Sequence, residues 1–217
     1  MFPSLFDLSS EDKEVNGFIL ENRDSLAIQF SKKRVKLEKT LEVIAAGVRE
    51  TQKQRVLPME HIWNAAGYIN TCSFDLAVAG EALILEDDYW KRRYFSRMAA
   101  INIYEASIDI PNIVGKEFRT EVARLPDGEG FLKGLGQEIK KLHTFRAAHA
   151  LWLKDIRVCC AAHRDKALRE QLRIVFEISP TKVLRVMAEF DALLNELGAL
   201  FQQGMELMPE HVPRKNQ

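Results

Sequence analysis

Cysteine is scarce in this chain, and the spacing of the three cysteines excludes two common uses. They are Cys72, Cys159 and Cys160 among 217 residues. An odd number, with two residues adjacent, is not the pattern of a disulfide framework. No Cys-x-x-Cys pair is present, so we expect no structural zinc site. This cysteine usage favours a reducing compartment, and we predict a cytoplasmic protein.

Excess charge is also absent, because 31 Lys and Arg residues balance 31 Asp and Glu residues. A neutral chain has no long-range attraction for nucleic acid or anionic membranes, so either must be bound by a local patch. The first ten residues lack a basic stretch followed by an apolar run, which predicts no secretory signal. The most apolar segment, 62–85, contains Asn64, Asn70, Asp75 and Glu81, and we expect a buried helix there and no membrane contact.

Several motifs that bind metals or phosphates are missing. No Glu-x-x-His pair of the di-iron bundle type occurs, and Gly-x-Ser-x-Gly and Walker-type loops are absent. A metal site would have to form from residues far apart in the chain. We therefore predict no metal and no cofactor.

Alternating strand patterns are absent as well, whereas helical periodicity is widespread. We predict an all-α bundle of six or seven helices, divided into an N-terminal helical extension (1–57), a helical bundle (58–208) and a frayed tail (209–217). Asp87 or Asp88 is the expected cap of a helix that begins near Tyr89, and Ser179 is the expected cap of the last helix. The expected helices are 10–56 with a break near 22–25, 58–85, 89–124 interrupted at Pro111, 142–165, 165–176 and 180–208. A loop is expected at 125–130, and the stretch 131–141 is poorly determined.

The helix predicted at 142–165 is the one on which we expect the bundle to be built. Its apolar stripe also carries His149 and His163, and a basic edge of Arg146, Arg157 and Arg164 runs beside that stripe. We expect the other helices to pack against this one.

A basic patch and a single acid mark the helix that begins at Tyr89. Glu105 lies on an apolar stripe, where a carboxylate needs a partner, either an arginine of another helix or a group in a functional site. The patch can hold single-stranded nucleic acid, or its long side chains can run past aromatic rings to solvent. It consists of Lys91, Arg92, Arg93 and Arg97, interleaved with Trp90 and Tyr94.

The segment from Ile156 to Asp165 resembles the motif of the HEPN superfamily, in which a histidine follows an arginine by four to six residues on a helix of a small bundle. Arg157 and His163 are the matching residues. The resemblance extends to the helices between about residues 87 and 208, but not to the first 57 residues. It implies a HEPN-like core and a homodimer in which both motifs line one cleft.

The activity that this resemblance implies is RNA cleavage without a metal. His163 would act as general base or acid on the ribose 2′-hydroxyl, and Arg157 would stabilise the charge on the phosphate. Arg93, Arg97, Glu105 and Arg164 are the predicted substrate-binding residues.

The alternative is a non-catalytic helical module that dimerises or binds an unknown partner protein. An ideal helix sets residues six apart at about 120° around its axis. Arg157 and His163 would therefore meet only if the helix ends or distorts near Ala162, or if a second protomer contributes. In the non-catalytic alternative, His163 lies near the C-terminal helix dipole and Arg157 pairs with a carboxylate such as Glu105.

Overall fold

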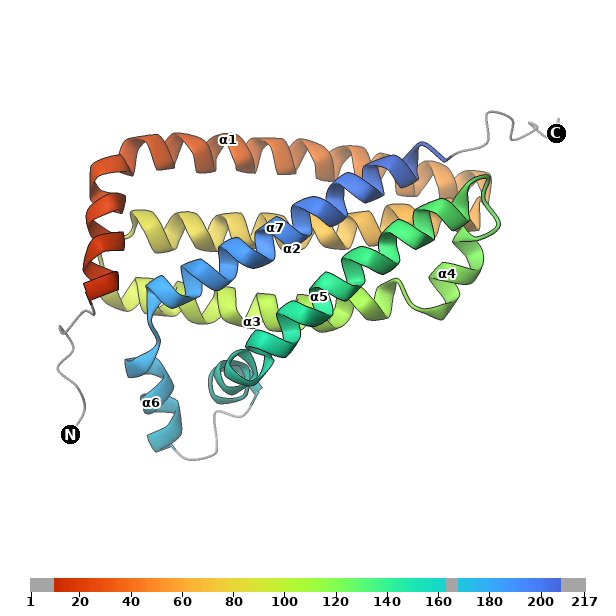
Figure 1. Ribbon diagram of the computed structural model, residues 1–217. Coiled ribbons are helices and arrows are strands. Elements are labelled where there is room, and N and C mark those ends of the chain that lie inside the picture. Colours follow the sequence, from red (N-terminus) through yellow and green to blue (C-terminus); the bar gives the residue numbers. More distant parts are fainter. Residues whose placement is uncertain (1–9, 163–167, 208–217) are drawn as a thin grey trace.

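The computed structural model describes residues 10–162 and 168–207, and all regular structure in these ranges is helical (Figure 1). The predicted all-α bundle of six or seven helices is confirmed. Its elements are α1 (Ser10–Gln54), α2 (Leu57–Leu85), α3 (Tyr89–Ile113), α4 (Lys116–Val122), α5 (Gly128–Arg157), α6 (Leu168–Glu177) and α7 (Pro180–Met205), with a π-helical turn η1 (Val158–Ala162) directly after α5.

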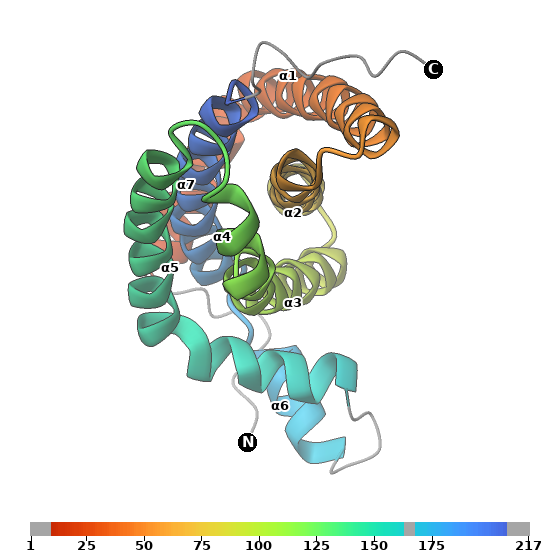
Figure 2. The same ribbon diagram turned by 90° about the vertical axis from the view of Figure 1, so that its right-hand side faces the viewer.

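Helix α2 is the centre of the bundle, with α1, α3, α4 and α7 packed around it (Figure 2). The expectation that the other helices pack against the one predicted at 142–165 is therefore wrong, because α5 packs chiefly against α3 and α7. Small buried residues such as Ala65, Ala66 and Ala79 let its neighbours approach closely. Among the described helices, α2 is also the one long and apolar enough to cross a membrane by length and composition. A core helix has the same properties, and α2 has packed neighbours on several sides here.

Helix α1 changes direction in its first, red part, which runs across the end of the bundle before the helix turns along α2 (Figure 1). We predicted a break near residues 22–25; the helix stays continuous through this stretch. Arg23 connects this first part of α1 to the segment between α2 and α3. Its Nη1 donates to Asp87 Oδ1 at 2.6 Å and its Nη2 donates to the Leu85 carbonyl.

Pro111 lies inside the last turn of α3, and the helix ends two residues later at Ile113 rather than at the proline. The predicted loop at 125–130 is shorter than expected, because α5 already begins at Gly128. A side chain at this glycine would place its Cβ 2.1 Å from the Val122 carbonyl oxygen, so only glycine fits without a backbone shift. Helix α5 then continues without interruption through residues 131–141.

A cluster of three phenylalanines closes the end of the bundle where α5 begins. Phe118 of α4, Phe131 of α5 and Phe201 of α7 have ring centroids 5.5 to 6.4 Å apart. The expected start signals of two helices are confirmed: Asp88 Oδ1 accepts from the Lys91 amide at the start of α3, and Ser179 Oγ accepts from the Lys182 amide at the start of α7.

Candidate functional site

Arg157 is the last residue of α5, and its guanidinium reaches across to α3. Its Nε donates to Glu105 Oε1 at 2.7 Å, and the two side chains are 38% and 40% exposed. Glu105 thus has the arginine partner that one of our two sequence interpretations required. A pair with this much solvent contact contributes at most about 1 kcal/mol to stability, because water screens it.

The turn that follows Arg157 is distorted. Residues Val158–Ala162 form a single π-helical turn, so the regular helix ends at the arginine. Such turns often occur at functional sites. His163 and Arg164 lie outside the described residues, and their predicted roles stay predictions.

Arg93 and Arg97 lie in a different part of α3 from Glu105. Twelve residues separate Arg93 from Glu105, which corresponds to about 18 Å along a helix. Arg97 Nε donates weakly to the Arg93 carbonyl at 3.4 Å, and its guanidinium lies 5.8 Å from the centre of the Tyr94 ring. The structure therefore brings Arg157 to Glu105 and leaves the two other arginines elsewhere on the helix.

The Arg93 side chain is only 4% exposed and lies among aromatic rings where α6 covers α3. Its guanidinium carbon is 4.5 Å from the centre of the Tyr89 ring and 5.8 Å from that of Phe176. Its Nη2 donates to the Phe176 carbonyl at 2.6 Å. Arg93 thus attaches the end of α6 to α3 through a charged hydrogen bond and ring stacking, and its predicted contact with substrate stays a prediction.

Replacing Arg93 by alanine is expected to weaken the attachment of α6 to α3. The lost hydrogen bond and stacking are worth about 2 kcal/mol together, which is about a thirtyfold rise in the local opening equilibrium. Hydrogen–deuterium exchange should show this rise for the α6 amides and unchanged protection in α7. Arg97→Ala is the control, and an α6 exchange rate equal to that of the wild type would contradict the proposed attachment.

Two further contacts connect α5 to its neighbours. Arg173 of α6 lies 3.7 Å from Asp155 of α5, and His149 Nε2 lies 2.8 Å from Glu189 Oε2 of α7. His149, one of the two histidines on the predicted stripe, therefore faces a carboxylate of α7. Sequence reasoning missed this contact, because Glu189 is an exposed residue of α7 and does not lie on an apolar stripe.

A polar cluster between α2 and α3 was not predicted either. The Tyr68 hydroxyl donates to Asp109 Oδ2 at 2.9 Å, and Cys72 lies one helical turn further along α2. Burial, followed by the bond to Asp109, raises the pKa of Tyr68 above its usual value. Burial also raises the pKa of the Cys72 thiol to about 11. Both groups are therefore neutral at pH 7, and neither is an activated nucleophile.

The Cys72 thiol is expected to react slowly with iodoacetamide in the folded protein. A rise in pKa from 9.0 to about 11 lowers the thiolate fraction at pH 8 about a hundredfold, and only the thiolate reacts. Mass spectrometry after timed alkylation measures the rate at this residue. The same chain in urea is the control, and equal rates in the two states would show that the thiol is not protected.

Within the described residues, no group of three or more His, Cys, Asp or Glu side chains is placed to hold a metal ion. The candidate site consists of Arg157, Glu105 and the π-helical turn at the end of α5. The chain matches no family model, no curated protein and no solved structure. The resemblance to the HEPN superfamily therefore rests on the residues of this chain alone.

Proposed function

We propose that this protein is a HEPN-like ribonuclease that cleaves RNA without a metal ion at the end of α5. The observation that carries the proposal is that the α-helix ends at Arg157 and the chain continues as a π-helical turn. On an ideal helix Arg157 and His163 would point about 120° apart, and they meet within one chain only if the helix ends or distorts near Ala162. The π-helical turn is such a distortion, and the proposal also requires the chain to turn between Ala162 and His163.

The chemistry requires two groups around one phosphate. His163, as general base, takes the proton of the ribose 2′-hydroxyl, and the 2′-oxygen attacks the phosphorus while the bond to the 5′-oxygen of the next nucleotide breaks and that oxygen takes a proton from water. The products are a 2′,3′-cyclic phosphate and a 5′-hydroxyl end. Arg157 donates two parallel hydrogen bonds to the phosphate oxygens as negative charge develops on them.

Glu105 has a positioning role in this scheme. In the absence of RNA its carboxylate holds the Arg157 guanidinium at 2.7 Å. Both side chains are more than a third exposed, so a phosphate can approach and share the guanidinium. We further propose that two protomers place their α5 ends at one cleft.

A second candidate is a HEPN-like fold without the chemistry, acting as an interaction module. The Arg157–Glu105 pair favours it, because a purely structural arginine would show the same contact. In that case the pair only links α5 to α3.

The experiment that separates the two candidates is incubation of the full chain with labelled RNA in the presence of EDTA. Cleavage into fragments with 2′,3′-cyclic phosphate ends supports the ribonuclease. The matched control is the same RNA carrying 2′-O-methyl groups, which has no attacking hydroxyl and should stay intact. RNA that remains intact in the first reaction would rule out the ribonuclease and leave the interaction module.

A further inference from the structure

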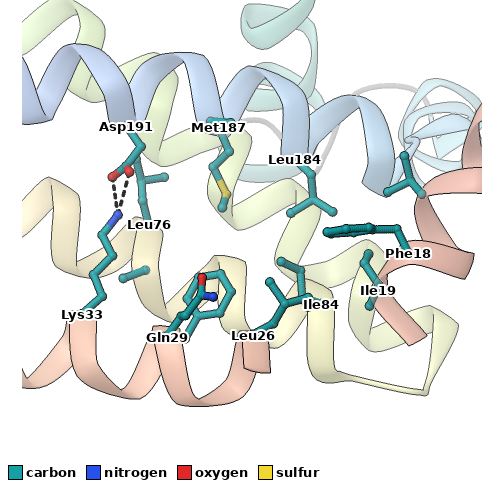
Figure 3. A pocket seen from close by; sticks show the side chains of 14 residues that line it. Phe18, Ile19, Leu26, Gln29, Lys33, Leu76, Ile84, Leu184, Met187 and Asp191 are labelled. Atoms are coloured by element: carbon teal, nitrogen blue, oxygen red, sulfur yellow. Dashed lines mark hydrogen bonds and ion pairs between the residues drawn. The ribbon is translucent and has the colours of Figure 1, made fainter. Parts of the chain in front are cut away.

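A groove lies on the side of α7 that faces α1. Its volume is about 400 Å³, and its walls are α1 and α7. Leu26 of α1 and Leu184 of α7 belong to these walls, and Leu76 and Ile84 of α2 also line the groove (Figure 3). Lys33 and Asp191 close one end through two hydrogen bonds of 2.6 and 2.7 Å.

A glycine of α2 lets two side chains of the groove lining lie close to this helix. At Gly80 a Cβ would lie 2.5 Å from Met187 Cε and 3.2 Å from Phe30 Cε1. Met187 and Phe30 therefore occupy the space above Gly80, and the groove lies on their outer side. The result is an apolar depression that stays open to solvent, with Phe18 58% exposed near its other end.

The dimensions of the groove match two or three apolar side chains on a helix. A cavity of about 150 Å³ accommodates one benzene ring, so about 400 Å³ takes two or three groups of that size. The lining of α7 runs from Leu184 to Asp191, which is about 10 Å. Apolar side chains at positions i, i+3 or i+4, and i+7 of a bound helix span the same length.

An open groove suits an amphipathic helix better than a small molecule. Small ligands usually lose 70–90% of their surface to a pocket, whereas a half-open groove leaves one side of its occupant in water. An amphipathic helix brings its own polar outer face to that side.

The charged residues beside the Lys33 end of the groove indicate which charge a partner carries. Lys33 is neutralised by Asp191, and Arg34 by Glu81 at 2.7 Å. The neighbouring Lys32 and Lys36 are exposed and form no ion pair within the described residues. These two positive charges lie at the Lys33 end and are complementary to acidic side chains.

We propose that this groove binds an acidic amphipathic helix of a partner protein. The helix places two or three apolar side chains into the groove and directs Asp or Glu toward Lys32 and Lys36. This site is on the side of α7 away from α5, so the inference does not rest on RNA cleavage.

The test is a selection of helical peptides from a randomised display library against the full chain. Enriched peptides are expected to carry apolar residues at i, i+3 or i+4, and i+7 together with acidic residues. The affinity of these peptides should fall at least tenfold for Ala188→Trp, which fills the groove from an exposed position of α7. Ala199→Trp, at an exposed position of α7 outside the groove, should bind within about twofold of the wild type.

Charge reversal gives a second measurement. The double variant Lys32→Glu, Lys36→Glu should lower the affinity for the acidic peptides at least tenfold. Circular dichroism melting confirms that each variant is folded.

Three outcomes would overturn the proposal. Selected peptides that bind Ala188→Trp as well as the wild type place the contact elsewhere. A dimer that Ala188→Trp converts to a monomer in sedimentation assigns the groove to a second copy of this chain. Binding of decanol to the wild type but not to Ala188→Trp, with no peptide enriched, assigns it to a small amphiphile.

Discussion

For the proposed ribonuclease, replacing Arg157 by alanine is expected to lower the rate of RNA cleavage by about a hundredfold to a thousandfold. Loss of one charged donor that stabilises developing negative charge has effects of this size. Stability should change by no more than about 1 kcal/mol, because the Arg157–Glu105 pair is more than a third exposed on both sides. Initial rates with a defined RNA oligonucleotide, together with thermal melting, separate the two effects.

Variants of neighbouring residues make this prediction specific. Arg157→Lys keeps the charge but loses the forked donor geometry, so its rate should lie between those of the wild type and the alanine variant. Glu105→Gln leaves the guanidinium in place, and its loss of rate should be smaller than that of Arg157→Ala. Lys154→Ala removes an exposed charge one turn earlier on α5 and should cleave at the wild-type rate. Equal rates for Arg157→Ala and the wild type would exclude the arginine from the chemistry.

Phe201→Ala is expected to lower the free energy of unfolding by about 3–5 kcal/mol. The Phe201 side chain is 1% exposed, and its ring contacts those of Phe118 and Phe131. The substitution leaves a cavity where α4, α5 and α7 meet, and the surrounding helices can close it only in part. For a chain of this size the melting temperature should fall by about 6–20 °C.

Phe18→Ala is the matched control for this substitution. The Phe18 side chain is 58% exposed, so its removal should change the free energy of unfolding by less than about 0.5 kcal/mol. Denaturant titration of both variants against the wild type gives the two values. A change below about 1 kcal/mol for Phe201→Ala would mean that the phenylalanine cluster does not hold this end of the bundle together.

The fold class could be predicted because helical periodicity is a local property. The apolar positions of α5, including Leu142, Phe145 and Ile156, repeat every three or four residues and are buried as expected. Capping residues behaved in the same way: Asp88 and Ser179 mark helix starts through bonds to amides only three residues away. Such signals need no knowledge of the rest of the chain.

The start of α5 could not be predicted, because the low helix propensity of glycine was misleading. Gly134 and Gly136 weaken an isolated helix, so the sequence predicts no definite secondary structure for residues 131–141. At Gly134 a Cβ would lie 3.1 Å from Leu200 Cδ1, so the missing side chain lets α7 approach. Packing thus compensates for propensity there; at Gly136 no atom lies within 4 Å, and the structure gives no reason for the glycine.

The candidate site could be predicted in part from the sequence, whereas the groove could not. A carboxylate on an apolar stripe needs a partner, and that rule alone pointed from Glu105 to an arginine such as Arg157. The groove depends on which stripes of α1 and α7 face each other, and its closing pair, Lys33 and Asp191, is 158 residues apart in the chain. No local pattern carries that information.

Helix α7 forms a wall of the groove through Asp191 and contacts α5 through Glu189, two residues earlier. A helix is stiff over so short a distance, so an occupant that shifts or rotates α7 would also displace the carboxylate that holds His149. The groove and the proposed site at the end of α5 are then thermodynamically linked. Any factor by which a bound partner changes the affinity for RNA must equal the factor by which RNA changes the affinity for that partner.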